Sequence, residues 1–379
     1  MGEVATKAPE TGGQRYPPSP GRSGSILRAS VRQQSAQLID GGSYGLLIGV
    51  LSALLLVSVL VGISIGAVSL PLCDVWTSIA RHLTGGVAAM DDVNDRIIWE
   101  FRTPRVLLAG VVGAGLSVAG TVLQALVRNP LADPYVLGVS SGASLAAVAV
   151  ILLGSAALLG LGVSLAAFLG AIGAMLAVMA LGQRSGRFSP TRLILAGVAI
   201  GALCSAATSY LQIKAQPQQL QGVLFWLLGS VAGADWQDLG VPSAAVLVTS
   251  GWLLLQARPL NALLMGEESA TALGVDVNRF RLQLVIVSSL LTGAVVAVSG
   301  GIGFVGLMIP HVARMLVGPD HRRVLPTAVL LGASYLILVD LAARTLQRPV
   351  ELPLGIFTAS IGAPFFIWLM RRTTRLGGA

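Results

Sequence analysis

Charged residues are scarce in this sequence. Only 11% of the 379 residues are Asp, Glu, Lys or Arg, while 54% are hydrophobic, whereas soluble domains carry about 25% charged residues. This composition excludes an ordinary soluble domain and predicts a polytopic membrane protein. The formal net charge of +8 does not indicate nucleic-acid binding, because the Arg residues lie between apolar runs instead of forming one basic patch.

Lysine and cysteine are also rare. Lys7 and Lys214 are the only lysines, and neither follows a glycine, whereas a P-loop needs Gly-Lys-Ser/Thr. The chain therefore has no Walker-type nucleotide site and binds no cofactor directly, so ATP and Mg²⁺ for any driven step belong to a partner ATPase subunit. Cys73 and Cys204 have no second metal or redox ligand at useful spacing, which predicts packing residues and no metal site.

The chain begins with a polar stretch, residues 1–40, that is rich in Gly, Pro, Ser, Gln and Arg. Such a segment cannot bury a core and is predicted to be a disordered cytoplasmic tail. Residues 41–373 form the predicted transmembrane domain, and residues 374–379 form a second cytoplasmic tail.

Apolar windows between the charges define the predicted membrane spans, since a helix needs about 20 apolar residues to cross. The window 134–183 has to hold two spans, and the window 282–313, broken at Gly300, holds one or two. Both chain ends are basic, which places both in the cytoplasm and requires an even number of crossings. The sequence thus predicts ten transmembrane helices. The windows are 41–73, 106–127, 134–183, 193–213, 239–257, 282–313, 324–339 and 352–370.

Several glycine, valine and proline residues in the first half of the chain recur 180 residues later in the second half. Five helices separate the copies, so the second copy would be inverted, as in many transporter folds. We therefore expect an inverted internal repeat, with the translocation path between the halves. The matching positions are Gly113 and Gly293, Val118 and Val298, Gly120 and Gly300, Pro130 and Pro310, and Gly138 and Gly318.

A short soluble helix is predicted at about 262–276, between spans six and seven. Glu267 and Glu268 suit a first helical turn, and Gly274 suits the left-handed position after a helix. Leu263, Ala270 and Leu273 would give it a shallow apolar face for another protein. A plain cytoplasmic loop with one helical turn is the alternative that this pattern leaves open.

Several long motifs, in order from about residue 44 to 372, resemble the FecCD permease family, the membrane subunits of ABC importers for iron-siderophores, haem and cobalamin. The motifs are Arg102-Thr103-Pro104-Arg105, Gly120 with Gln124, Arg128 to Pro134, Leu137 to Ala143, Gly266 to Val275, Gly303 to Arg314, Gly318 to His321, Glu351 to Gly355, and Gly362 to Pro364.

This resemblance implies a fold of ten transmembrane helices per subunit and a pore formed by two subunits, either a homodimer or a heterodimer with a second permease subunit. It also implies docking of an extracytoplasmic substrate-binding protein through arginines that map onto Arg102, Arg105 and Arg344, although ordinary interfacial arginines are an alternative for the first two. The short helix would be the segment that couples to the cytoplasmic ATPase subunits. Its implied contact residues are Gly266, Glu267, Glu268, Ala270, Leu273 and Gly274.

Polar and proline residues near span ends are further candidates for the path. We expect them to fix helix ends and bends, and we expect Asp133 and Asp340 to be satisfied by a cap or a local ion pair instead of forming a proton relay. The candidates are Gln124, Asn129, Pro130, Pro310 and His311.

The function predicted from the sequence is the permease subunit of an ABC importer in the cytoplasmic membrane, not itself an enzyme. Its expected cargo is a bulky metal chelate, with iron-siderophore first and haem or cobalamin next. An ion-coupled secondary transporter or channel is the competing class, but it needs a carboxylate at mid-membrane. An intramembrane enzyme would need a convergent His, Asp or Cys cluster within the spans.

Overall fold

The structure is a computed structural model that describes residues 2, 41–66, 70–84, 93–184 and 187–376. The chain divides into two units, and the second, Asp40–Ala379, contains every element named below. The predicted disordered tail lies outside the described residues, apart from Gly2.

Helices dominate the fold, which confirms the predicted all-α class. The elements of the first half are α2 (Gly41–Ser64), α3 (Leu72–Thr84), α4 (Val93–Arg96), the π-helix η1 (Ile97–Arg102), α5 (Thr103–Val127), the 3₁₀ helix η2 (Pro134–Leu137), α6 (Val139–Leu153), the 3₁₀ helix η3 (Ser155–Leu158), α7 (Val163–Gly182) and a two-stranded antiparallel hairpin of β1 (Gln183–Arg184) and β2 (Arg187–Phe188).

The second half continues with long helices separated by short ones. Its elements are α8 (Pro190–Ile213), α9 (Pro217–Leu228), α10 (Trp236–Leu255), α11 (Ala257–Leu264), α12 (Glu267–Ala272), α13 (Val277–Ser299), α14 (Val305–Val317), α15 (His321–Thr345) and α16 (Leu354–Leu376). Helix α16 reaches Leu376, so the first residues of the predicted C-terminal tail, 374–376, are helical, and the assignment of residues 374–379 as a cytoplasmic tail stays a prediction.

In the described part of the chain, 8 helices are long and apolar enough to cross a membrane, and α6 and α14 are shorter apolar helices. Window 134–183 does hold two helices, α6 and α7, and window 282–313 is divided between α13 and α14 at the predicted glycines. The count of ten crossings stays a prediction, because α14 has 13 residues and a full span needs about 20.

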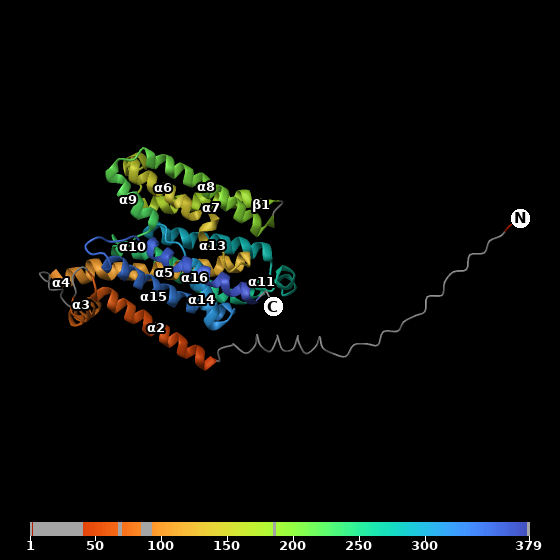
Figure 1. Cartoon of the computed structure of the whole chain (residues 1–379), viewed down its shortest axis with the longest axis horizontal. Coiled ribbons are helices and arrows are strands. Elements are labelled where there is room, and N and C mark those ends of the chain that lie inside the picture. The colour runs from red at the N-terminus through yellow and green to blue at the C-terminus, as the bar shows by residue number, and fades with distance from the viewer. Residues whose placement is uncertain (1, 3–40, 67–69, 85–92, 185–186, 377–379) are drawn as a thin grey trace. The chain divides into compact units, whose positions relative to one another are not determined.

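Helix α5 is the centre of the bundle. Together with α4 and η1 it forms one continuous helical stretch. In the most apolar 18 residues of this stretch 89% are buried, whereas the same measure is 22% for α2 and 17% for α16. In Figure 1, α5 lies between α13 and α15, with α6, α7 and α8 in a layer beyond α13 and α2 beyond α15. Glycine makes this density possible: a Cβ on Gly120 would overlap the carbonyl oxygen of Gly306, and one on Gly113 would overlap that of Gly332.

Polar caps fix where the helices near the candidate site begin. The Asp276 carboxylate accepts from the Arg279 amide at the start of α13, and the Asp320 carboxylate accepts from the Arg322 amide at the start of α15. Both are ordinary N-cap contacts, which satisfy amides that have no partner within the helix. Helix α13 ends at Ser299, and the residue that caps it, Gly300, has a positive φ of 66°, which favours glycine.

The two ends of the bundle differ in what they carry. The Tyr44 hydroxyl donates to the Arg323 carbonyl at 3.4 Å, so α2 and α15 begin at the same end, where α11 and α12 also lie; we name this the short-helix end. The opposite end, with α3, α4 and the start of α5, carries Arg102, Arg105 and Arg344, and we name it the arginine end (Figure 1). Which end faces the cytoplasm stays a prediction.

Candidate functional site

The predicted coupling segment is two short helices, not one. Helix α11 ends at Leu264 and α12 begins at Glu267, because Gly266 between them has a φ of 113°, which an L side chain rarely adopts. The expectation of a single helix over 262–276 is therefore corrected. The predicted role of Gly274 is confirmed: its φ is 82°, its amide donates to the Thr271 carbonyl, and the Val275 amide donates to the Ala270 carbonyl, as in a Schellman motif.

Burial divides the predicted contact residues of this segment. Ala270 is 0% exposed, so its inclusion in a partner-facing surface is corrected: its methyl group packs against the rest of the chain. Leu263, expected on the same face, is also fully buried. Leu273, by contrast, is 67% exposed. The exposed residues of α12 are thus Glu267, Glu268, Thr271 and Ala272, and the exposed surface continues over Leu273 and Gly274 after the helix.

Glu267 anchors α12 to two long helices. Its Oε1 accepts from Arg281 Nη2 of α13 at 2.5 Å and from Arg128 Nη2, just after α5, at 3.3 Å. The hydrogen bond from Arg281 and the positive charges of Arg281 and Arg128 outweigh desolvation and lower the pKa of the Glu267 carboxyl. Arg128 itself takes a left-handed conformation, φ 54°, as the C-cap of α5. The glutamate predicted to suit a first helical turn therefore also joins that turn to the core.

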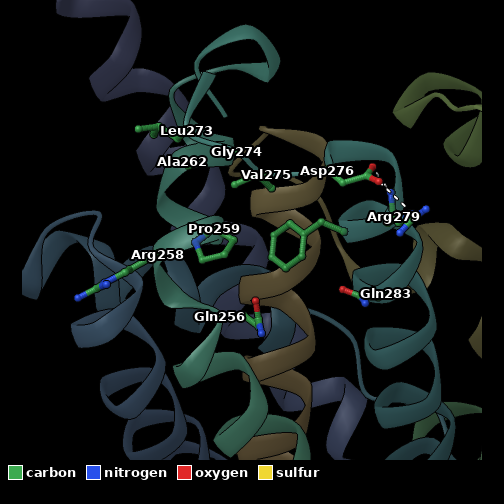
Figure 2. Close-up of a pocket in the computed structure, with 11 residues that line it drawn as sticks. Gln256, Arg258, Pro259, Ala262, Leu273, Gly274, Val275, Asp276, Arg279 and Gln283 are labelled. Carbon is green, nitrogen blue, oxygen red and sulfur yellow. Dashed lines mark hydrogen bonds and ion pairs between the residues drawn. The ribbon is translucent and has the colours of Figure 1, made fainter. Parts of the chain in front are cut away.

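Two cavities lie beside α12 and the turn that follows it. The first, about 630 Å³ in volume, lies between α11 and the start of α13 (Figure 2). Figure 2 shows Arg258 on one side of this cavity and the Asp276–Arg279 ion pair, 3.0 Å long, on the other. The second cavity, about 610 Å³, is lined by Glu267 and Thr271 of α12 and by Arg281 of α13. The second cavity therefore borders α12 itself, the first borders the turn that follows it, and the two linings share Val275 and Asp276. The first cavity is lined by Gln256, Arg258, Pro259, Ala262, Leu273, Gly274, Val275, Asp276, Arg279, Phe280 and Gln283.

At the arginine end, two of the three predicted docking arginines are buried. Arg102 Nη1 donates to the carbonyls of Ile63 and Ser64, and Arg344 donates to the Gly62 carbonyl, so both guanidinium groups satisfy the C-terminal turn of α2. Each of these two arginines is 7% exposed, and their predicted role in docking a binding protein stays a prediction.

Arg105 is held by two carboxylates from other elements. Its Nη2 lies 2.9 Å from Asp340 Oδ1 on α15, and its Nη1 lies 2.9 Å from Glu351 Oε1 before α16. Asp340 also pairs with Arg344 at 3.3 Å, which confirms that a local ion pair satisfies this aspartate. The arginines nevertheless border a cavity of about 380 Å³. It is lined by Gly66, Ile97, Phe101, Arg102, Arg105, Ala232, Arg344, Arg348, Pro349 and Glu351.

The remaining path candidates do not form one site. Gln124 joins α5 to α14: its Nε2 donates to the Leu307 carbonyl at 3.1 Å, and its Oε1 accepts from Arg314. His311, also on α14, meets the edge of the Phe365 ring at a centroid distance of 6.0 Å. Pro310 lies inside α14.

Asn129 and Pro130 lie in the turn after α5, where Asn129 Oδ1 accepts from the Leu131 amide at 2.9 Å. This turn chemistry agrees with the expected role at a helix end. Asp133 is likewise satisfied by a cap, since its Oδ1 accepts from the Tyr135 amide at 2.9 Å.

Sequence reasoning missed two groups that organise the site. Asn261 on α11 contacts Asp320 and His321 at the start of α15, and Tyr135 exchanges two hydrogen bonds of 2.8 Å with the backbone of Ile302. The Asp320 cap before an apolar helix could have been found from the sequence. Nothing in the spacing of Asn261 predicts its partner, because the partner lies far along the chain.

The fold and the two specialised ends define a helical membrane permease, and comparisons with known proteins narrow the class. The pattern of the FecCD transport family matches residues 54–372. The hemin transport system permease protein HmuU of Yersinia pestis is 43% identical over 330 residues, covering 86% of this chain and 96% of that protein. The cobalamin import system permease protein BtuC of Halobacterium salinarum is 44% identical over 275 residues, covering 73% of each.

A solved structure agrees with the sequence comparisons. It is an inward-facing conformation of a protein assigned as a metal-chelate type ABC transporter, with a TM-score of 0.74 and 35% identity, covering 86% of this chain and 99% of that one. The chain belongs to the FecCD transport family and is a multi-span permease of the ABC importer type.

Proposed function

We propose that this chain is the translocation subunit of an ATP-driven importer in the cytoplasmic membrane, moving a bulky metal chelate inward. The observation that carries the proposal is helix α12, which has exposed residues, borders a cavity and is anchored through Glu267 to α13 and to the end of α5. Because the sequence has no P-loop lysine, ATP and Mg²⁺ bind to cytoplasmic ATPase subunits, and α12 is where their motion enters.

The arginine end supports a partner on the opposite side. Arg102, Arg105, Arg344 and Arg348 border one cavity there, with Glu351 as the acidic residue of its lining. Such an excess of positive charge favours association with an acidic surface, and an extracytoplasmic substrate-binding protein is the partner we propose. A second permease subunit, identical or related, would cover part of the apolar surface that helices such as α16 expose.

The substrate class rests on the family. Related permeases are described as hemin and cobalamin importers, and both cargoes are large metal-bearing macrocycles. We propose iron-siderophore as the first cargo to test, with haem and cobalamin as the alternatives. An ion-coupled transporter is less favoured, because the carboxylate within α15, Asp340, is held by Arg105 and Arg344.

Uptake by a deletion strain tests this function. Cells lacking the gene should lose uptake of one class among radiolabelled ferric siderophore, hemin and cyanocobalamin, and the wild-type gene should restore it. The purified chain should also retain a soluble ATPase whose hydrolysis rises when loaded binding protein is added. Normal uptake of all three cargoes in the deletion strain would exclude the proposal.

A further inference from the structure

Asn261 connects α11 to α15 through its side-chain amide. Its Nδ2 donates to Asp320 Oδ1 at 2.6 Å, and its Oδ1 accepts from the His321 amide at 3.0 Å. The same oxygen lies 2.7 Å from His321 Nδ1, which must carry the proton because an amide oxygen only accepts. A flipped amide would set its NH₂ against the His321 backbone N–H and its oxygen against the Asp320 carboxylate, so these two contacts fix one orientation. We name this set the Asn261 contact.

The partners of Asn261 form the first turn of α15. Asp320 caps this helix by accepting from the Arg322 amide, and His321 is 1% exposed. Helix α15 then runs without a break for 25 residues, about 37 Å at 1.5 Å per residue. Its far end carries Asp340 and Arg344, which belong to the ion-paired group at the arginine end. One continuous helix therefore joins the Asn261 contact to the opposite face of the protein.

Polar contacts hold the short helices to the bundle at two points. Glu267 ties α12 to α13 and to the end of α5, while Asn261 ties α11 to α15. Leu260 and Leu263 of α11 are fully buried and supply apolar packing, but such packing is not directional. Hydrogen bonds to a charged group have a defined geometry and a larger energy than neutral ones, so the Asn261 contact fixes the position of α11 against the start of α15.

We propose that Asn261 is a positioning residue that transmits displacement of the short helices to α15, and hence toward the arginine end. The inference rests on the proposed function, because the displacement is assigned to an ATPase partner bound at α12.

An exchange of the two partners tests the Asn261 contact. Asn261→Asp removes the donor and sets two carboxylates against each other. In Asn261→Asp/Asp320→Asn the amide at position 320 donates to the carboxylate at position 261, which still accepts from His321, and the amide oxygen can still cap Arg322. Gln283→Glu, the same amide-to-carboxylate change at an exposed residue of α13 at the same end, is the control for an added negative charge.

The first measurement is hydrogen–deuterium exchange of residues 257–272 in the purified full-length chain, which requires no knowledge of its function. Asn261→Asp should raise exchange roughly tenfold, as expected for loss of a hydrogen bond to a charged group. The double variant should restore the wild-type rate, and Gln283→Glu should not change it. Unchanged exchange in Asn261→Asp would overturn the inference whatever the chain transports.

The second measurement is substrate transported per ATP hydrolysed by the reconstituted complex. Asn261→Asp should lower this ratio at least about fivefold, the scale of a modest coupling between sites, while the ATPase still co-purifies, and the double variant should recover it. A wild-type ratio in Asn261→Asp, despite raised exchange, would overturn the transmission role. A wild-type complex without ATP-dependent transport would overturn the proposed function instead, and the exchange result would still decide whether the contact exists.

Discussion

At the residue scale, the most consequential side chain at the arginine end is Asp340. It is 1% exposed and lies between Arg105 and Arg344, which the sequence places on different spans. A buried carboxylate that compensates two guanidinium groups is strongly destabilising to remove, because the cations then stay buried without their counter-charge.

Asp340→Asn should therefore lower the free energy of unfolding by about 3 kcal/mol or more. The measurement is the thermal unfolding midpoint of the purified protein in detergent. Glu351→Gln is the matched control, since the Glu351 side chain is 40% exposed and exposed ion pairs contribute about 1 kcal/mol or less. Equal shifts of the thermal midpoint in the two variants would show that the buried ion pairs of Asp340 stabilise the protein no more than the exposed pair of Glu351 does.

Glu267 gives a second test at this scale, through pH. Its pKa is lowered from the usual 4.5, so its stabilising contact is present at neutral pH and is lost as pH falls below 4.5 and through the lowered value. An environment-sensitive fluorophore on Leu273→Cys, in a Cys73→Ala/Cys204→Ala background, should report a more mobile α12 in that acidic range.

In the same labelled background, Glu267→Gln should show a mobile α12 already at pH 7, because the charge is absent at every pH. Glu268→Gln, the adjacent carboxyl, is the control and should follow the unmodified profile. Identical profiles for all three proteins would mean that the contacts of Glu267 with Arg281 and Arg128 do not hold the helix.

At the scale of elements, the crossing of α5 and α14 depends on the absence of a side chain. A methyl group at Gly120 would overlap the backbone of Gly306, whereas one at Gly173 on α7 would meet no atom within 4 Å. Overpacked interiors typically cost about 1 to 3 kcal/mol, and backbone atoms give way less readily than side chains.

Gly120→Ala should accordingly lower the thermal midpoint, while Gly173→Ala should leave it unchanged or raise it slightly, since alanine favours the helix. Both proteins are compared in the same detergent, with membrane expression level as the second readout. A Gly120→Ala protein as stable as Gly173→Ala would show that α5 and α14 separate at little cost.

At the scale of the whole molecule, composition and periodicity predicted the helical class, the helix pairs in two long windows and the break at Gly300, because each depends on local chemistry. The glycine φ at position 274 followed from the same logic. Burial of Ala270, Arg102 and Arg344 could not be predicted. The local sequence of a short helix or of a span end does not show which of its sides packs against the rest of the chain. Long-range partners such as Asn261 and Asp320 are brought together by the fold and leave no local signal.

The membrane orientation is the last whole-molecule property that the charge pattern predicts. Basic segments favour the cytoplasmic side, which places the short-helix end inside and the arginine end outside. Cys73, on α3 at the arginine end, is exposed, and Glu268 is exposed on α12.

In a Cys204→Ala background, Cys73 should therefore react with a membrane-impermeant maleimide in intact cells or spheroplasts. Glu268→Cys, in a Cys73→Ala/Cys204→Ala background, should react only after the membrane is opened. Both proteins should label equally in detergent, which controls for intrinsic reactivity. Labelling of both positions from one side would break the assignment of the two ends, and with it the separation of an ATPase-facing surface from a binding-protein surface.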